Sequence, residues 1–348
     1  MKQGRTMTAV VFLGRGRFEV RRAPVPSPGE GEVLLKVVAC GVCGTDFHIC
    51  AGEYTEGVSP PIVIGHEIAA RVEEAGPGVT SVECGQFCAV DPVIGCGVCA
   101  HCRRGEANLC AAPTIIGYKR NGGFAQYCLV PEGSVIPMDE SVGPAGGVLC
   151  ETLACVLRGY DRLEFRAGSS AMVLGAGTVG LLWMQLLKHS LCTKRVQTDL
   201  AAFRRDKAEA LGADAAIDPA VEGFERRVRD ELPCGADFLI DATGDPGAIA
   251  QAWPLLAKGG TLMPFGCCPA GSTLNVDPSQ IFSKELKIVG SKMPPGRLDR
   301  AARLIEAGFI DCGAIVTNIR GLQETGAVVA GFADHRNDQV KVAIDPWK

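Results

Sequence analysis

The stretch that decides the fold is "AMVLGAGTVGLLWMQLLKHS", residues 171–190. A run of apolar residues ends at Leu174, a G-x-G-x-x-G motif follows, and apolar residues at helical spacing come next. Gly175 permits a tight turn, Gly177 lets a pyrophosphate approach the backbone, and Gly180 lets a helix pack closely on a strand. Strand, glycine-rich turn and helix in this order predict a dinucleotide site at the N-terminus of the helix.

The predicted dinucleotide site extends to the next strand, which ends at Asp199, about 20 residues further on. A carboxylate there can accept hydrogen bonds from ribose hydroxyls and would repel a 2′-phosphate, so NAD is favoured over NADP. Arg204 and Arg205 follow closely and keep NADP open, and an ordinary glycine-rich turn with a surface aspartate is the alternative. The residues expected to contact the cofactor are Gly175, Gly177, Thr178, Val179, Gly180, Asp199 and Arg204.

The organisation of the chain changes on the two sides of residue 154. Beyond it, strand-like runs alternate with helical patterns, which predicts parallel strands joined by right-handed crossovers. Before it, short apolar or β-branched runs separated by turns predict an all-β region, to which the closing run "QVKVAIDP" (339–346) could return. The predicted fold class is α/β, with a doubly wound parallel-sheet domain (154–290) inserted into a β-rich domain (1–153 and 291–348).

Length, composition and charge exclude several classes of protein. The 348 residues suffice for two domains with separate cores. A hydrophobic share of 47%, a charged share of 21% and a formal net charge of −4 are typical of a soluble globular protein and lack the basic excess of a nucleic-acid binder. No apolar run approaches the roughly 18 residues of a membrane span, and the stretch 9–13 is too short for the core of a signal peptide. We therefore expect a cytoplasmic protein with neither a nucleic-acid nor a membrane partner.

A cysteine cluster occupies "CGVCAHCRRGEANLC", residues 96–110. Four thiolates held by short turns suit a closed tetrahedral zinc site with no open position for chemistry. An iron–sulfur cluster and disulfides are the alternatives, but the charged insert before the last cysteine fits a zinc lobe better, and the total of 17 cysteines is odd. The predicted lobe spans about residues 92–112, and its ligands are Cys96, Cys99, Cys102 and Cys110.

A second metal site is indicated by three separate segments, "CGVCGTDFH" (40–48), "GHE" (65–67) and "CETLA" (150–154). A catalytic zinc typically has three protein ligands and one exchangeable position, which Cys43, His66 and an acidic residue could provide. By spacing alone, His66 could equally be a core histidine with its own hydrogen-bond partners.

In this order, "CGVCGTDFH", "GHE", the four cysteines, "GGFAQY", "ETLACVLRG" and "GAGTVG" resemble the zinc-dependent medium-chain dehydrogenase/reductase family over nearly the whole chain. The glutamate of "CETLA", where other alcohol dehydrogenases carry a cysteine, is similar to the polyol branch that includes sorbitol dehydrogenase. The resemblance implies a GroES-like catalytic domain interrupted by a Rossmann domain, with two zinc ions per chain, one catalytic and one structural. It also implies a homo-oligomer, dimer or tetramer, with a dimer surface along edge strands near "TLMPFGCC" (261–268).

The resemblance also implies roles for single residues. Cys43 and His66 become ligands of the catalytic zinc, Glu151 stands at the third-ligand position, and Glu67 would exchange with it or hold a zinc-bound water. Cys150 competes with Glu151 for the third position.

The remaining implied roles concern protons. Asp46 would fix the tautomer of His66, Thr45 would link the substrate hydroxyl to a proton exit, and His48 would relay the proton to solvent. The alternatives are that Thr45 only caps a helix and that His48 is an ordinary surface residue.

The implied reaction is hydride transfer from a secondary alcohol to NAD, giving a ketone, with a polyol, sugar alcohol, cyclitol or aminocyclitol as the small-molecule substrate. A threonine-type amino alcohol or a simple secondary alcohol is the alternative. A nucleotide-binding structural or regulatory module is disfavoured, because it would not need the proposed ligands and proton relay together. Three residues are predicted to shape the substrate pocket: Tyr54, Lys292 and Arg297.

Overall fold

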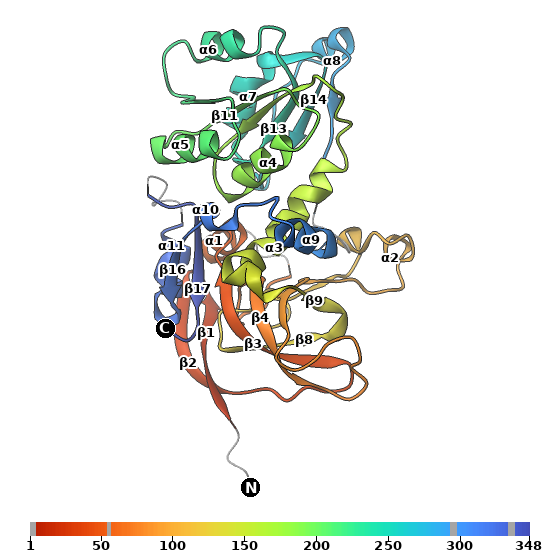
Figure 1. The fold of residues 1–348 in the computed structure, drawn as a ribbon, viewed down its shortest axis with the longest axis vertical. Helices are drawn as coiled ribbons and strands as arrows, with labels where there is room; N and C mark the ends of the chain where they lie inside the picture. The colour runs from red at the N-terminus through yellow and green to blue at the C-terminus, as the bar shows by residue number, and fades with distance from the viewer. Residues whose placement is uncertain (1–4, 54–56, 293–297, 333–337) are drawn as a thin grey trace.

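A computed structural model of the chain describes residues 5–53, 57–292, 298–332 and 338–348. Two bodies are stacked along the long axis of the molecule (Figure 1). The parallel-sheet body holds the strands β10 to β15, and the mixed-sheet body holds the other strands. Among the described residues, no helix is both long enough and apolar enough to cross a membrane.

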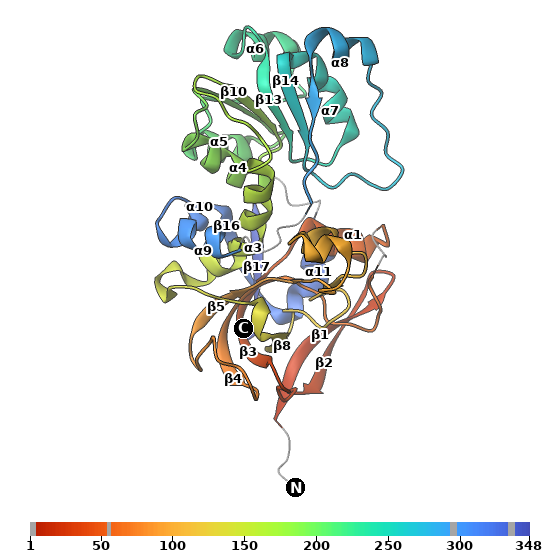
Figure 2. The ribbon, with the colours of Figure 1, turned by 90° about the vertical axis from the view of Figure 1, so that its right-hand side faces the viewer.

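The parallel-sheet body contains six strands in the order β12-β11-β10-β13-β14-β15, and all neighbours are parallel. Their bounds are β10 Ser170–Leu174, β11 Lys194–Thr198, β12 Ala215–Ile217, β13 Ala236–Asp241, β14 Leu256–Pro264 and β15 Lys287–Ile288. The helices between them are α4 Thr178–Lys188, α5 Ala202–Ala210, α6 Phe224–Glu231, α7 Pro246–Ala252 and α8 Pro278–Lys284. Figure 2 shows α4 and α5 on one side of the sheet and α7 on the other. The chain order reverses between β10 and β13, which is where such sheets bind dinucleotides.

The turn between β10 and α4 depends on its glycines. Gly175 has φ +87°, in the left-handed region, and a Cβ on Gly180 would lie 1.9 Å from the carbonyl oxygen of Gly175. The buried Gln197 of β11 donates its side-chain N–H to the same carbonyl, over 2.8 Å. The side chain of Gln197 therefore stabilises the turn by a hydrogen bond. Helix α4 can approach β10 closely because residue 180 has no side chain.

The mixed-sheet body is built from both ends of the chain. Its main sheet has seven strands, in the order β16-β17-β3-β4-β5-β9, with β8 also paired to β3. Their bounds are β3 Glu32–Gly41, β4 Glu67–Ala75, β5 Phe87–Val90, β8 Tyr127–Pro131, β9 Val135–Pro137, β16 Val316–Gly321 and β17 Lys341–Asp345. The C-terminal strand β17 pairs antiparallel with β3, with Ala343 opposite Gly41 and Ile344 opposite Cys40. The closing segment thus returns to the N-terminal part of the chain.

Smaller elements complete this body. Two further strand pairs are β1 Thr6–Gly14 with β2 Arg17–Pro24, and β6 Val93–Ile94 with β7 Thr114–Ile115. The helices are α1 Gly44–Ala51, α2 Ala100–Arg103, α3 Gly143–Tyr160, α9 Leu298–Glu306, α10 Cys312–Ile315 and α11 Thr325–Ala330. Short 3₁₀ helices cover Ala107–Leu109, Glu132–Ser134, Glu140–Val142 and Leu322–Glu324, and one more, Trp253–Leu255, precedes β14 in the parallel-sheet body.

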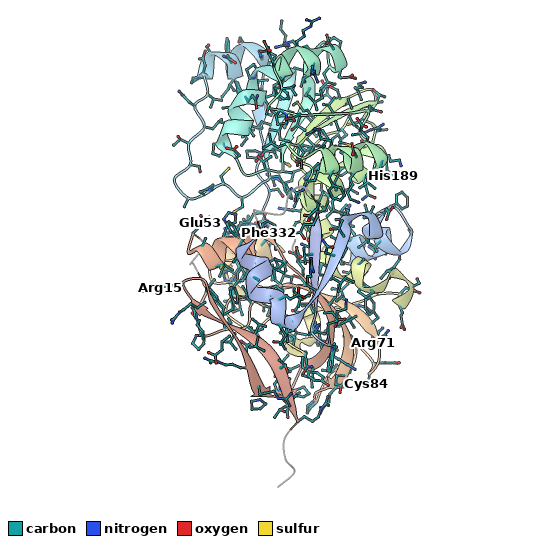
Figure 3. The ribbon with its side chains drawn as sticks, turned by 90° about the vertical axis from the view of Figure 1, so that its left-hand side faces the viewer. Arg15, Glu53, Arg71, Cys84, His189 and Phe332 are labelled. Atoms are coloured by element: carbon teal, nitrogen blue, oxygen red, sulfur yellow. The ribbon has the colours of Figure 1, made fainter. Side chains whose placement is uncertain are left out.

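Helix α3 joins the two bodies. It packs on β4 and α9 and also on α4, so one core cluster of apolar residues runs through both bodies. Trp183 of α4 is fully buried in this cluster, and its ring lies near that of Tyr160. A further link is made by His189, labelled in Figure 3, whose ring lies edge-on to that of Phe309 with centroids 5.0 Å apart. The predicted boundary at residue 153 falls inside α3, and both it and the boundary at 290 stay predictions.

The parallel sheet has an edge strand near residues 261–268, as expected. The segment 261–268 begins in β14, which pairs with β13 on one side and with β15 on the other. The edge is therefore β15, where Ile288 is 49% exposed. The strand-like run of residues 261–264 was visible in the sequence, but the two residues of β15 were too few to be recognised.

The substitution Gly180→Ala tests the close contact between α4 and β10. The added methyl group must displace the carbonyl of Gly175, and overpacking of this kind lowers the free energy of unfolding by about 1–3 kcal/mol. The matched control is Gly133→Ala, where a new Cβ meets no described atom within 4 Å. Urea denaturation of the two variants measures the difference, and equal stabilities would contradict the packing described here.

Candidate active site and metal centres

The N-terminus of α1 positions three of the predicted residues. The helix begins directly after β3, and Cys43 is its N-cap residue. Asp46, fully buried in the first turn, accepts a hydrogen bond from the backbone N–H of Cys43 over 2.9 Å. Thr45 is therefore not the residue that caps the helix. Its hydroxyl oxygen lies 3.6 Å from the sulfur of Cys43, which is the donor.

Cys43, His66 and Glu67 form a close group. One ligand atom from each lies within 4.8 Å of the others. His66 is buried, and its Nδ1 makes no hydrogen bond with a described residue, although it faces Asp46 Oδ1 at 3.8 Å. A thiol, an imidazole and a carboxylate gathered in this way are donors that zinc takes. These residues therefore fit a zinc ion.

The charges around His66 also fit a cation. The pKa of His66 is raised well above its usual value: burial is the largest influence and lowers it, but the hydrogen bond with Cys43 and the negative charges of Cys43, Asp46 and Glu151 outweigh that. Burial raises the pKa of both Asp46 and Glu151. Several acidic groups thus surround one imidazole in the interior, an arrangement that a divalent cation would stabilise.

Glu67 is anchored on both of its oxygens. Oε1 accepts a hydrogen bond from the hydroxyl of Thr152 over 2.7 Å, and Oε2 forms an ion pair with Lys341 of β17. Both ionic partners are buried. Burial alone would raise the pKa of Glu67, but the charge of Lys341, followed by that of His66, lowers it. The sequence alone did not indicate a role for Lys341 or Thr152. The one available signal was the position of Lys341 inside the apolar run of β17, where a charged side chain needs a partner.

Glu151 approaches the group from α3 without joining it as closely. Its carboxylate is buried, and Oε1 accepts a hydrogen bond from the thiol of Cys155, one helical turn further on, over 3.4 Å. The neighbouring Cys150 donates its thiol to the carbonyl of Leu298 over 3.6 Å and so faces α9. Of the two competing side chains, Glu151 is therefore the one on the side of His66.

Two more groups lie near His66 and Thr45. Tyr118 lies edge-on to the His66 ring, with centroids 5.5 Å apart and an interplanar angle of 75°. His48, one turn along α1, is partly exposed, and its Nδ1 lies 2.6 Å from Glu53 Oε2. Figure 3 shows Glu53 at the edge of the mixed-sheet body that faces the other body. His48 is therefore open to solvent, and its role as a relay stays a prediction.

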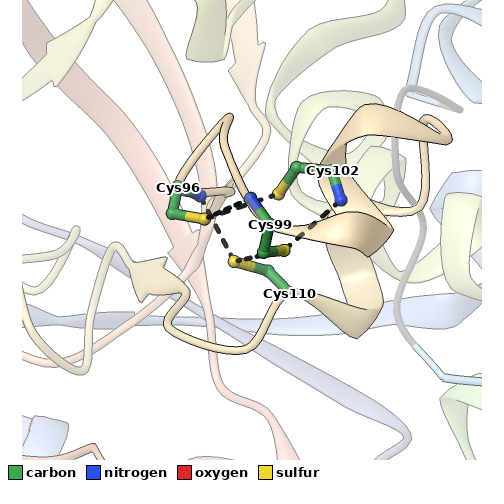
Figure 4. A group of neighbouring side chains, drawn as sticks. All are labelled: Cys96, Cys99, Cys102 and Cys110. Carbon is green, nitrogen blue, oxygen red and sulfur yellow. Dashed lines mark hydrogen bonds between the residues drawn. The ribbon is translucent and has the colours of Figure 1, made fainter.

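The four cysteines of the lobe also come together (Figure 4). The sulfurs of Cys96 and Cys102 are 4.0 Å apart, as are those of Cys99 and Cys110. Backbone N–H groups point at these sulfurs, for example that of Cys96 at Cys110 over 3.2 Å, which stabilises thiolates. His101 instead has its Nδ1 3.1 Å from Glu106 Oε2. None of the 17 cysteines, all of which the structure describes, forms a disulfide.

In the predicted dinucleotide site, Asp199 is tied to the glycine-rich turn. Its Oδ2 accepts a hydrogen bond from the backbone N–H of Ala176 over 2.8 Å. Thr178 and Val179 begin α4 just beyond that turn. Arg204 donates to the carbonyl of Gln339 over 3.0 Å. Arg205 donates to the carbonyls of Asp199 and Leu200 and pairs with Asp218. The carboxylate thus stands beside the turn, and so does Arg204, whose Nη1 lies 3.8 Å from the place of a Cβ on Gly177.

The residues expected to shape the substrate pocket are only partly placed. Tyr54 and Arg297 lie outside the described residues. Lys292 is described, and its backbone carbonyl accepts a hydrogen bond from Asn108 Nδ2 over 2.7 Å. This bond connects the four-cysteine lobe to the segment that follows the parallel sheet.

Comparison with known proteins supports the family resemblance. Residues 29–140 match the family model "Alcohol dehydrogenase GroES-like domain", and residues 178–307 match "Zinc-binding dehydrogenase". The chain is 33% identical to L-threonine 3-dehydrogenase of Pyrococcus horikoshii, over 86% of this chain and 87% of that protein. It is 30% identical to D-arabinitol dehydrogenase 1 of Uromyces fabae, over 98% and 97%. A crystal structure described as a zinc-binding dehydrogenase from Sinorhizobium meliloti 1021, bound to NADP, superimposes with a TM-score of 0.93 at 34% identity, over 98% of this chain and 100% of that one.

The substitution Lys341→Met tests the buried ion pair. It leaves Glu67 charged and unpaired in the interior, and the loss of one partner of a buried pair costs about 3–5 kcal/mol of stability. In the double variant with Glu67→Gln no charge is left unpaired, so its free energy of unfolding should be closer to that of the wild type. Denaturant titration of both proteins decides the question. A single variant as stable as the double one would show that the pair is not what holds Glu67.

Proposed function

The chain belongs to the zinc-binding dehydrogenases that carry an alcohol dehydrogenase GroES-like domain, and we propose that it oxidises a secondary alcohol group of a polyol to a ketone with NAD as hydride acceptor. The observation that carries this proposal is the group of Cys43, His66 and Glu67 next to the hydroxyl of Thr45. A nucleotide-binding module would have no use for buried metal-binding donors beside a hydroxyl. The chain is an oxidoreductase that acts on an alcohol.

We place the catalytic zinc on Cys43 and His66, with a carboxylate as third ligand. When bound, zinc acts as a Lewis acid and lowers the pKa of an alcohol hydroxyl toward neutrality. The carboxylate of Glu67 is close enough to Cys43 and His66 to bind the same ion, but it is already bonded to Thr152 and Lys341. The carboxylate of Glu151 accepts one weak hydrogen bond, from Cys155. A small rotation of Glu151 is thus easier than a release of Glu67. Asp46 would hold the Nδ1 proton of His66 and keep the other ring nitrogen free to bind.

Thr45 and His48 would move the proton. The Thr45 hydroxyl lies next to Cys43, so it is within hydrogen-bond reach of an alcohol oxygen bound beside that sulfur. His48 is partly exposed and can take a proton to solvent. The four-cysteine lobe would hold the second, structural zinc, because four sulfurs leave that ion no open position.

The cofactor would lie over the glycine-rich turn. Asp199 beside that turn can accept hydrogen bonds from the ribose, which supports NAD, whereas Arg204, in the first turn of α5, brings a guanidinium next to Gly177. The Sinorhizobium relative was solved with NADP, so a 2′-phosphate is the competing case for this chain. The ratio of kcat/KM for NAD and NADP distinguishes the two.

The substrate class is the least constrained part of the proposal. Relatives are named for a polyol, D-arabinitol, and for an amino alcohol, L-threonine. Glu151 at the third-ligand position supports the polyol. A spectrophotometric screen of NAD reduction with sugar alcohols, cyclitols, L-threonine and simple secondary alcohols tests it, and a higher kcat/KM for L-threonine than for any polyol would favour the amino alcohol.

We also propose a cytoplasmic homo-oligomer, a dimer or tetramer. All the cysteines carry free thiols, which suits a reducing compartment. The edge strand β15 and the preceding α8 expose Ile288 and Phe282, the latter by 88%, as a surface for a second copy of the chain.

Metal analysis separates the two proposed zinc sites. Cys43→Ser should lower the zinc content from about two to about one ion per chain and abolish alcohol oxidation, because a catalytic site loses its thiolate. Cys99→Ser should remove the other ion and lower the thermal midpoint, since a closed site contributes folding energy. Zinc per chain is measured by atomic emission. An active Cys43→Ser protein that keeps both ions would rule out this ligand.

Paired glutamate variants identify the third ligand. We expect Glu151→Gln to weaken zinc binding and lower kcat by at least about tenfold, because a neutral amide replaces an anionic ligand. Glu67→Gln should mainly lower stability, since Lys341 then loses its counter-charge. Zinc affinity from competition with a chelator, measured beside kcat, decides between them. The reverse pattern would make Glu67 the ligand.

A further inference from the structure

Cys155 is a thiol bonded to one of the two carboxylates that could be the third zinc ligand, and the mechanism so far gives it no role. It stands four residues after Glu151 in α3, and side chains at this spacing share one face of a helix. Its thiol donates a hydrogen bond to Glu151 Oε1 over 3.4 Å. Because a thiol keeps its proton at neutral pH, Cys155 remains a donor to this carboxylate.

Helix α3 supplies a hydrogen-bond donor to each of the two candidate carboxylates. Thr152 donates to Glu67 Oε1 over 2.7 Å, and the other oxygen of Glu67 is paired with Lys341. Glu151 has the thiol of Cys155 as its donor. A thiol is a weaker donor than a hydroxyl or an ammonium group. The bond to Glu151 can therefore be exchanged for a bond to a metal ion more easily than the two bonds of Glu67.

The bond to the thiol leaves Glu151 outside the metal-binding group. Among the described residues, this group consists of Cys43, His66 and Glu67, whose ligand atoms lie within 4.8 Å of one another. The next residue in α3, Thr152, bonds Glu67, so the backbone at Glu151 lies next to the group. The carboxylate of Glu151 is buried there but turned to the thiol.

Resting on the function proposed above, we propose that Cys155 is a positioning residue that holds the carboxylate of Glu151 away from the metal-binding group and so competes with the catalytic zinc for it. A hydrogen bond to a carboxylate stabilises its charged form in the position where the bond is made. Binding of this carboxylate to zinc requires that the bond to the thiol be given up, which lowers the zinc affinity of the site. A third ligand that can leave also helps to keep a position exchangeable, as a catalytic site requires. Cys155 acts through Glu151 and does not itself bind the ion.

The test is the affinity of the catalytic site for zinc, measured by competition with a chelator, in Cys155→Ala and in the same substitution combined with Glu151→Gln. The variant Cys43→Ser, expected to keep only the ion of the four-cysteine lobe, identifies which of the two ions belongs to the catalytic site. Cys150→Ala is the matched control, because Cys150 is a thiol of the same helix that donates to the carbonyl of Leu298 instead.

We expect Cys155→Ala to raise the zinc affinity about two- to tenfold, as for the loss of one competing hydrogen bond, whereas the loss of a merely structural side chain would lower it. In the Glu151→Gln background the same substitution should change nothing, because a neutral amide does not replace the carboxylate on the ion. Cys150→Ala should bind zinc as the wild type does.

The outcomes separate this role from the proposed function. An unchanged or lower zinc affinity of Cys155→Ala, an equal rise in the Glu151→Gln background, or an equal rise in Cys150→Ala would overturn the role of Cys155 alone. A wild-type protein that holds no more zinc than Cys43→Ser, and whose zinc affinity Glu151→Gln does not change, would overturn the proposed function and this role together.

Discussion

A buried lysine from the last strand balances a buried glutamate beside the metal-binding group, and the rest of the site depends on that balance. Glu67, Asp46 and Glu151 would otherwise bring negative charges into the interior around one imidazole. A buried charge without a partner lowers the free energy of unfolding, so each carboxylate needs a cation or a hydrogen bond. Lys341 supplies the cation for Glu67, which leaves His66 to face Asp46, and a bound metal ion would add positive charge to the same group.

The ion pair between Lys341 and Glu67 depends on the sheet in which the two ends of the chain meet. Lys341 begins β17, and β17 pairs with β3, whose last residues lead into Cys43 and α1. Gly41 lies at this junction, where a Cβ would lie 2.1 Å from Glu67 Oε2. The ion pair therefore fits only because the neighbouring strand carries no side chain at that point. Strand pairing, charge and metal ligands are in this way parts of a single arrangement.

Close backbone contacts occur both at the glycine-rich turn and beside His66. Gly180 lets α4 meet the turn at Gly175, and Gly117 and Gly122 let a distant turn meet Gly65 next to His66. In each place the absence of a Cβ permits a close approach, of a helix N-terminus in the first case and of the turn that carries the Tyr118 ring in the second. Helix α3 then connects the two sites, because it carries Glu151 and packs on α4.

The sequence by itself determined the features that depend on residues close together in the chain. The glycine-rich turn, the alternation of strands and helices, and the four-cysteine lobe follow from local spacing, and the order of the motifs identified the family. Tertiary structure alone decided the partners of these residues. The pairing of β17 with β3 brought Lys341 to Glu67, and the contact at Gly65 brought Tyr118 to His66. The choice between Cys150 and Glu151 depended on the rotation of α3, a helix buried on so many sides that its apolar pattern does not reveal which face meets the site. Contacts between distant segments depend on strand pairing and helix rotation, which short-range patterns do not specify.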